Sequence, residues 1–277
     1  MQFSIVTPSF RNSQWLKLCI ASVADQECVT VEHIVQDAGS DDGTLDWLPQ
    51  DTRVTAYIEK DNGMYDGINR GFKRAKGDFL AWLNCDEQYL PGALKAVGDF
   101  FDSRPEVDVV LTDTVVVDTE GRYICHRKSL IPVKHEMWYR FAVTSCSLFL
   151  RRTVLDRYGI YFDTKWRALG DLFWVMEMVE RKVSMATLCY FTSAFADTGE
   201  NLCLTPSATA ERQMKMEMAP IWVKPLRPAI IFDHVVRRYF NGFYFQKPFT
   251  YSIYTLRAPD MRVVFHVDKP TALWQRG

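Results

Sequence analysis

The stretch NGMYDGINRGFKRAKGDFLAWLNCDE, residues 62–87, decides the fold of this chain. Its first half predicts a helix over residues 65–76, because apolar side chains recur there at helical spacing. Gly77 fits the turn that ends such a helix. Residues 79–83, FLAWL, are continuously apolar, which is typical of a strand buried on both faces of a sheet. The stretch therefore predicts a helix that leads into a central strand.

An acidic segment stands where this predicted strand ends, and it consists of Asn84, Cys85, Asp86 and Glu87. In open α/β sheets, ligands bind outside the carboxyl ends of the strands. Two carboxylates at such a position offer hard oxygen ligands for Mg²⁺ or Mn²⁺, the usual partners of a diphosphate. We therefore expect an enzyme that handles a nucleotide-linked substrate.

The flanking sequence alternates between strand-like and helix-like segments. Strands are expected at 3–7, 31–36, 54–58 and 107–112, and helices at 14–23, 44–48 and 92–101. The less regular second half predicts a hairpin over 115–125, strands at 147–150 and 183–195, and helices at 172–181 and 211–218. This alternation favours an α/β fold with a mainly parallel central sheet flanked by helices on both faces.

The decisive stretch closely resembles the core motif of family 2 glycosyltransferases. That motif is a Gly-x-Tyr-Asp-x-x-Asn-x-Gly helix followed by a strand ending in Leu-Asn-x-Asp-Asp, and Glu87 replaces its last Asp. The stretches IVTPSFRN at 5–12 and HIVQDAGSDDGT at 33–44 are also similar to the family, so the resemblance covers roughly the first hundred residues most strongly. It weakens beyond residue 200. The resemblance implies the GT-A fold and transfer of a sugar from a nucleotide-sugar.

The resemblance implies that the nucleotide lies against the ends of the first two strands. The residues expected to surround the base are Thr7, Pro8, Ser9 and Phe10. Asp37 would accept a hydrogen bond from a base N–H, such as the uracil N3–H. The same residue types also build ordinary turns, so an Asx turn at Asp37 is the structural alternative.

Three residues of the predicted helix at 65–76 and the turn before it are expected to shape the nucleotide pocket. Gly63 would supply a permissive backbone at the pocket wall. Asp66 and Asn69 lie three residues apart and share a helix face. Their structural alternative is capping of the helix and bracing of a loop, since a carboxylate is favoured near a helix N-terminus.

The resemblance assigns the chemistry to two acids. Asp86 would hold the divalent ion, Mg²⁺ or Mn²⁺, that bridges the two phosphates, with Asn84, Cys85 and Glu87 beside it as supporting or sugar-contacting groups. Asp171, in RALGDLFWVMEM, would be the base that takes the proton of the acceptor hydroxyl in an inverting transfer.

Each of these acids has an alternative. Asp171 would otherwise cap a helix, and Asp163 and Arg167 are reserve candidates for the catalytic role. In some GT-A enzymes a histidine late in the sequence completes the ligand shell of the metal ion. His135 and His266 are the candidates for this role here. His266 alternates like a strand residue in VVFHVD, which favours a packing role.

Composition excludes several classes of protein. With 277 residues and a net charge of −1, the chain lacks the basic field of a nucleic-acid binder. Its seven cysteines are scattered without a CxxC pair, which argues against a disulfide framework and for a reducing compartment. We find neither a signal peptide nor an apolar run long enough to cross a membrane, and we therefore expect a cytoplasmic protein.

Residues 219–277 differ in composition from residues 1–218, which we expect to form the GT-A domain. Aromatic and basic residues dominate 219–257, and Asp233 is the one acid there. Such a segment can lie on the anionic inner face of a membrane. The alternative, which does not exclude the first, is a small helical appendage that packs its aromatic side chains on the catalytic core.

The leading hypothesis is a metal-dependent, inverting glycosyltransferase that uses a nucleotide-sugar, with UDP as the expected nucleotide. A saccharide or lipid-linked saccharide of a bacterial surface polysaccharide is the expected acceptor. One alternative is a sugar nucleotidyltransferase, although TPSFRNS lacks the glycines that grip a triphosphate. The other is a non-catalytic nucleotide- or carbohydrate-binding module, which would be expected to lack Asp86 or Asp171.

Overall fold

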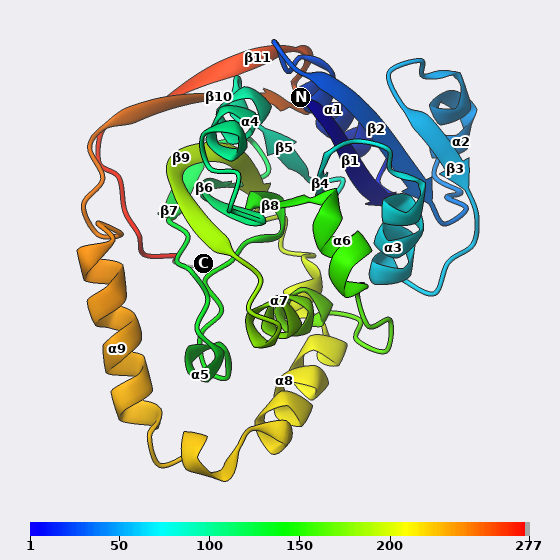
Figure 1. Ribbon diagram of the computed structural model, residues 1–277. Helices are drawn as coiled ribbons and strands as arrows, with labels where there is room; N and C mark the ends of the chain where they lie inside the picture. Colours follow the sequence, from blue (N-terminus) through cyan, green and yellow to red (C-terminus); the bar gives the residue numbers. More distant parts are fainter. Residues whose placement is uncertain (275–277) are drawn as a thin grey trace.

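The computed structural model describes residues 1–274 and contains one large sheet flanked by helices (Figure 1). The sheet has nine strands in the order β3-β2-β1-β4-β8-β6-β9-β5, with β7 paired to β6. A separate two-stranded sheet, β10-β11, crosses the top of the view in Figure 1. The predicted α/β architecture is confirmed.

The first half of the sheet is parallel, as predicted. It consists of β1 (Gln2–Ser9), β2 (Thr30–Asp37), β3 (Thr55–Ile58) and β4 (Phe79–Trp82). Ser9 at the end of β1 lies opposite Asp37 at the end of β2. The carboxyl ends of these strands therefore meet at one edge, where the predicted nucleotide-binding and acidic residues gather.

The second half of the sheet mixes directions. It contains β5 (Glu87–Tyr89), β6 (Val109–Val117), β7 (Tyr123–Arg127), β8 (Leu148–Arg151) and β9 (Met185–Ala196). Strand β8 lies antiparallel between β4 and β6, whereas β6 and β9 are parallel. Strand β5, which pairs antiparallel with β9, was not predicted. It begins at Glu87, so the acidic segment is a tight connection between two strands rather than an open end.

Helices cover both faces of the sheet. Helices α3 (Met64–Arg74), α6 (Arg152–Tyr158) and α7 (Gly170–Glu180) lie on one face, and α1 (Ser13–Ala24) and α4 (Ala93–Ser103) lie on the other. Side chains of β1 alternate between these layers, with Val6 in the first core and Phe3 and Ile5 in the second. Shorter elements are α2 (Thr44–Trp47) and the 3₁₀ turns Leu48–Gln50, Ser145–Ser147, Leu202–Leu204 and Ile221–Val223.

Two glycines of the decisive stretch allow close packing. A Cβ on Gly71 would lie 2.3 Å from the Val6 side chain, so α3 can approach β1 only with glycine there. Gly77 does not end the helix as predicted, because α3 already ends at Arg74. A Cβ on Gly77 would instead lie 2.7 Å from the backbone of Phe3, so its role is to let the chain enter β4 beside β1.

The C-terminal part combines helices with an unpredicted hairpin. Helices α5 (Lys134–Met137), α8 (Pro206–Met218) and α9 (Arg227–Phe240) lie at the lower rim of Figure 1. Strands β10 (Phe249–Thr255) and β11 (Ala258–Val267) form the hairpin, whose Tyr251 and Ile253 are buried with Val115 of β6. The segment after residue 218 is therefore not purely helical. Among residues 1–274, no helix is both long and apolar enough to cross a bilayer.

Candidate active site

The loop after β1 and the loop after β2 are tied into one wall. Asp37 is buried, and its Oδ1 accepts hydrogen bonds from the backbone N–H groups of Gly39 and Ser40 at 2.9 and 2.7 Å. The Ser40 hydroxyl donates to Asp37 Oδ2 at 2.8 Å and accepts from the Arg11 backbone N–H at 2.8 Å. The Arg11 guanidinium also pairs with Asp41. Asp37 thus forms the Asx-type turn considered as its alternative, at the edge predicted to bind a nucleotide.

The four residues at the end of β1 differ in their exposure and in their contacts. Thr7 is buried, and its hydroxyl lies 2.9 Å from Nε2 of His33. The Pro8 carbonyl accepts a hydrogen bond from the Cys85 thiol at 3.0 Å, which links this loop to the acidic segment. Ser9 is buried, whereas Phe10 is 54% exposed. Of these four residues, Phe10 is therefore the exposed one.

The start of α3 braces the neighbouring loops. Asp66 accepts hydrogen bonds from the Asn62 backbone N–H at 3.0 Å and from Arg70 at 2.8 Å. Asn69 uses both ends of its amide on the backbone of Phe162, at 2.8 and 2.9 Å. Both side chains therefore make the bracing contacts that sequence left as their alternative role.

Gly63 leaves room for the guanidinium group of Arg167 beside the loop that precedes α3. Its φ of +105° lies in the region that favours glycine. A Cβ there would lie 2.5 Å from Nη1 of Arg167, so the absence of a side chain makes room for the guanidinium. Arg167, a reserve candidate in the sequence, is thereby placed against the loop that precedes α3.

The acidic segment presents two carboxyl groups without a partner cation. Glu87 is fully buried, and it accepts hydrogen bonds from the Asn84 backbone N–H at 2.8 Å and from the Ser145 hydroxyl. Asp86 Oδ2 accepts a hydrogen bond from the Asn201 amide at 3.4 Å. Within residues 1–274, neither carboxyl group forms a salt bridge with a lysine, arginine or histidine.

Burial without a cation shifts both groups toward their neutral forms. Desolvation raises the pKa of Asp86 to about 6. Desolvation, followed by the charge of Asp86, raises the pKa of Glu87 to about 8. The side-chain oxygen of Asn84 is also buried and has no hydrogen-bond partner within the described chain. These oxygen donors, which lack a positive partner, fit a divalent cation such as Mg²⁺ or Mn²⁺.

Asp171 lies in the first turn of α7, as the sequence predicted. Its Oδ1 accepts hydrogen bonds from the Leu172 backbone N–H at 2.8 Å and from the Tyr65 hydroxyl at 3.4 Å. Burial raises its pKa to about 6. A Cβ on Gly170 would lie 2.6 Å from the Tyr65 ring, so glycine lets this tyrosine reach the start of α7. The arrangement holds a carboxyl group poised to exchange a proton near neutral pH.

Glu211 of α8 holds the loop that leads into Asp171, and sequence reasoning missed it. The buried carboxylate accepts hydrogen bonds from three successive backbone N–H groups, those of Arg167, Ala168 and Leu169, at 2.5, 3.0 and 2.8 Å. No local pattern could have revealed this contact, since about forty residues separate the partners along the chain.

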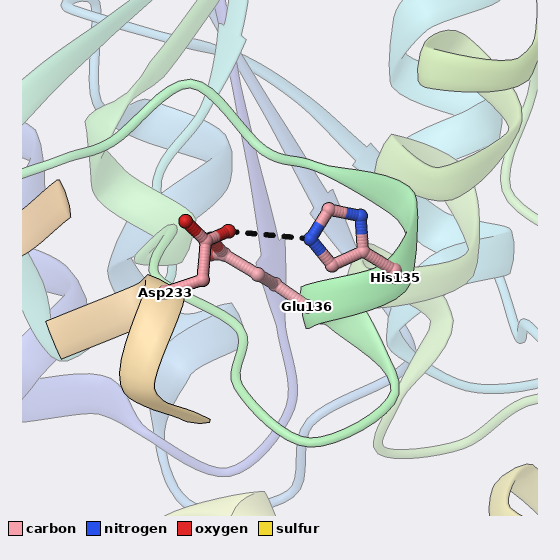
Figure 2. A group of neighbouring side chains, drawn as sticks. All are labelled: His135, Glu136 and Asp233. Atoms are coloured by element: carbon pink, nitrogen blue, oxygen red, sulfur yellow. Dashed lines mark hydrogen bonds and ion pairs between the residues drawn. The ribbon is translucent and has the colours of Figure 1, made fainter. Parts of the chain in front are cut away.

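A second cluster of potential metal ligands lies elsewhere. Figure 2 shows His135 and Glu136 of α5 facing Asp233 of α9, with 3.3 Å between the His135 ring and the Asp233 carboxylate. Glu136 is already occupied by His234 at 2.9 Å and by Arg237 at 2.6 Å. These interactions hold the pKa of Glu136 below its usual value despite burial. Because Arg237 already supplies a positive charge, this cluster does not fit a metal ion.

His135 and His266, the two histidines considered as metal ligands, do not lie beside Asp86. Figure 1 places α5, which carries His135, at the lower rim of the molecule and well apart from β4 and β5. His266 is exposed on β11, where it pairs with Thr250 of β10. The strand position expected for His266 is confirmed.

Comparisons with known proteins now define the class. The sequence model described as "Glycosyl transferase family 2" matches residues 4–162, which is more than half of the chain. The chain therefore belongs to glycosyl transferase family 2.

Two relatives indicate the range of similarity. A Mycobacterium tuberculosis protein called "PGL/p-HBAD biosynthesis glycosyltransferase" is 32% identical over 175 residues, which are 61% of this chain and 66% of that protein. The Bacillus subtilis "Putative teichuronic acid biosynthesis glycosyltransferase TuaG" is 31% identical over 106 residues, covering 36% of this chain and 42% of its own length. The matches thus span just under two thirds, or less, of these relatives.

Solved structures support the fold. Staphylococcus aureus TarS, crystallised with UDP-GlcNAc, superposes with a TM-score of 0.62 at 18% identity, covering 88% of this chain and 75% of that one. The mannosyltransferase PcManGT of Pyrobaculum calidifontis, in complex with GDP-Man and Mn²⁺, gives 0.57 at 13% identity, covering 84% and 75%. At these identities the likeness concerns the fold alone, and the expected GT-A architecture is confirmed.

Proposed function

We propose that this protein transfers a sugar from a nucleotide-sugar to an acceptor hydroxyl with inversion at the anomeric carbon, and that the transfer depends on a divalent metal. The observation that carries the proposal is the pair Asp86 and Glu87, one half-buried and one fully buried carboxyl group with no partner cation among residues 1–274, directly after the parallel strand β4. A UDP-sugar is the first candidate donor. The complex of TarS with UDP-GlcNAc supports this choice.

The donor would lie along the wall formed by the loops after β1 and β2. Phe10 offers an exposed ring beside the turn in which Asp37 holds the backbone N–H groups of Gly39 and Ser40. Asp86, together with the side-chain oxygen of Asn84, would hold the metal ion. When bound, the ion would supply positive charge to the diphosphate that departs. Arg167, held against Gly63, adds a second positive group near this wall.

Asp171 would act as the base. Its pKa of about 6 leaves it mostly ionised at neutral pH, so it can accept the proton of the acceptor hydroxyl. The acceptor oxygen forms its bond to the anomeric carbon as the bond between that carbon and the diphosphate oxygen breaks. Tyr65 and the Leu172 N–H hold the carboxylate in place during this step.

The acceptor is proposed to be a saccharide or lipid-linked saccharide in the assembly of a surface glycan. The names of the relatives, which refer to PGL/p-HBAD and teichuronic acid biosynthesis, support this class. A further support is a set of exposed apolar side chains on α9 and on the turns before and after it, which we call the rim face. It is defined by Ile221, Trp222, Phe232, Tyr239, Phe240 and Phe245, whose exposed fractions run from 48 to 92%.

The rim face is proposed to rest on an anionic membrane surface. Phe232 and Phe240 are 70 and 82% exposed on α9, and Lys224, Arg227 and Lys247 are exposed nearby along the chain. Aromatic side chains that enter the headgroup region, flanked by basic residues, are typical of proteins that lie on a membrane without crossing it.

Sedimentation with vesicles that contain anionic lipid tests the membrane contact. The double variant Phe232→Ser/Phe240→Ser should lose most of its binding, whereas Met261→Ser, an exposed apolar residue on β11, should bind like the wild type. Equal binding by both variants would contradict the contact. Substitution is preferable to deletion of residues 219–277, because Tyr251 and Ile253 of that segment belong to the core.

A donor assay tests the transfer reaction without knowledge of the acceptor. Purified protein is incubated with UDP- and GDP-sugars, with and without Mn²⁺, and release of the nucleoside diphosphate to water is measured. We expect metal-dependent release from one donor, with loss in Asp86→Ala. A sugar nucleotidyltransferase would instead form a nucleotide-sugar from a nucleoside triphosphate and a sugar phosphate. A non-catalytic module would bind a nucleotide without releasing one.

A further inference from the structure

A second pocket lies between the central sheet and the C-terminal hairpin. Its volume is about 450 Å³, within the range of small-molecule sites. Its lining includes Asp113, Lys128, Tyr190, Phe191, Phe249 and Tyr251. Neither Asp86 nor Asp171 lines it, so it is separate from the candidate catalytic centre.

Aromatic rings form one wall of this pocket. Phe191 of β9 stacks on Phe249 of β10 with 4.8 Å between ring centroids, and Tyr251 follows at 6.2 Å from Phe249. Tyr190 is 44% exposed beside them. Flat apolar faces in a wet pocket suit a ligand that has both C–H faces and hydroxyl groups.

A buried carboxyl group supplies the polar centre of the pocket. Asp113 interrupts the apolar strand β6 and is only 5% exposed. Its Oδ1 accepts a hydrogen bond from the Ser129 N–H at 3.0 Å, and no hydrogen bond within residues 1–274 reaches its Oδ2. A buried acid without an ion pair in a strand is uncommon, which points to a ligand. Burial also raises its pKa to about 7, so the group can donate as well as accept.

The charges of the pocket balance when Asp113 is ionised. Lys128 also lines the pocket, with its ammonium group held by the carbonyl oxygens of Gly242 at 3.0 Å and Phe245 at 3.4 Å. In that state the carboxylate and the fixed ammonium group leave no net charge to attract an anion such as a phosphate. Hydroxyl groups, which both donate and accept, match this pair better than an ion does.

We propose that this pocket binds an uncharged saccharide at a site separate from the catalytic centre, so that the enzyme holds a glycan at two places. Strand β10 connects the two places, since Phe249 and Tyr251 line the pocket and Tyr254 lines a small cavity together with Asp86. Three residues of strand from Tyr251 to Tyr254 span roughly 10 Å, which is within the reach of an oligosaccharide. The occupant class draws on membership of the glycosyltransferase family, and the site itself goes beyond the proposed reaction.

An array of neutral and anionic oligosaccharides, probed with the full chain, tests this site. We expect the wild type to bind neutral members and Tyr190→Ala to lose at least tenfold in affinity. Asp113→Asn should lose affinity as well, and because this buried change could disturb folding, its thermal unfolding is measured in parallel. Met214→Ala, an exposed apolar residue on α8 that does not line the pocket, is the control and should bind normally.

The exposed thiol of Cys189 gives a second readout, because it lines the pocket. The neutral oligosaccharide that binds best on the array should slow alkylation of Cys189 by iodoacetamide and leave alkylation of Cys28, which is exposed elsewhere, unchanged.

Asp86→Ala separates this site from the proposed reaction, since it should keep saccharide binding even if nucleotide binding is lost. The proposal is overturned if no neutral oligosaccharide binds, if only anionic members bind, or if Tyr190→Ala and Met214→Ala lose affinity equally. It is also overturned if the bound saccharide leaves the rate of Cys189 alkylation unchanged.

Discussion

Two carboxylate clusters of this molecule look alike in composition and differ in electrostatics. At the edge of the sheet, half-buried Asp86 and buried Glu87 have no partner cation, and desolvation raises their pKa values to about 6 and about 8. At the lower rim, Glu136 is also buried, but Arg237 and His234 bind it and its pKa falls. The protein has neutralised the second cluster with its own charges and left the first one without compensation.

This difference separates a structural contact from a candidate active site. A carboxylate that already has an arginine partner gains little from a metal ion, which would also be repelled by the arginine. Desolvated carboxylates without a partner are held at a cost, which is relieved either by protonation or by a bound cation. The Glu136 cluster therefore joins α5 to α9, and the Asp86 pair is the one suited to a metal and a diphosphate.

The largest effect is expected at the proposed base. Asp171→Asn removes the proton acceptor but keeps the shape of the side chain, so kcat should fall roughly 10³-fold. Binding of the nucleotide-sugar, measured by calorimetry, should stay within about twofold of wild type. A variant that retains full turnover would show that Asp171 only caps α7.

Loss of Glu136 should affect stability and leave the chemistry intact. Glu136→Ala leaves Arg237 and buried His234 without their partner, so the free energy of unfolding should fall by roughly 2 kcal/mol. Urea denaturation measures the change, and donor turnover at 20 °C should remain near wild type. If turnover is lost while the fold is intact, the two clusters are not distinct in function.

A smaller effect is expected at Glu211, which positions the loop before Asp171. Glu211→Gln weakens three charge-assisted hydrogen bonds to backbone N–H groups, and kcat should fall roughly tenfold with little change in KM for the donor. Glu217→Gln, on the exposed side of the same helix, is the matched control. Equal kcat values for Glu211→Gln and Glu217→Gln would show that Glu211 does not position Asp171.

The smallest effect near neutral pH is expected from a change of pH itself, which alters the fraction of Asp171 that is ionised. The base must be ionised, and burial raises its pKa to about 6, so kcat/KM should fall about tenfold per unit of pH below 6 and level off above it. An initial-rate profile from pH 5 to 8 checks this limb. A profile that stays flat down to pH 5 would contradict the raised pKa.

The sequence predicted those parts of the site that lie close together in the chain. The helix at α3, the strand β4 and the acidic segment after it all follow from hydrophobic periodicity and one motif. Glycine packing was harder to predict, because the role of Gly77 depends on the position of β1. The hairpin β10-β11 also escaped prediction, although His266 was expected on a strand, because the hairpin packs on β6 and β9, which lie far away in the sequence.

The sequence did not predict the hydrogen-bond partners of the site residues that lie far away in the chain. Ser145 donates a hydrogen bond to Glu87, and Glu211 accepts hydrogen bonds from the loop before Asp171. In both cases the partners lie far apart in the chain. Nothing in the local sequence marks a serine or a glutamate as such a partner, since both are ordinary loop and helix residues. The distinction between the Asp86 and Glu136 clusters likewise depends on where Arg237 lies in three dimensions.

Calorimetric titration of UDP and GDP, with and without Mn²⁺, tests the central claim most directly. We predict metal-dependent binding of one nucleotide by the wild type and by Glu136→Ala, and its loss in Asp86→Ala. Metal-dependent binding that survives in Asp86→Ala, or disappears only in Glu136→Ala, would contradict the assignment of the active site to the unpaired carboxyl groups.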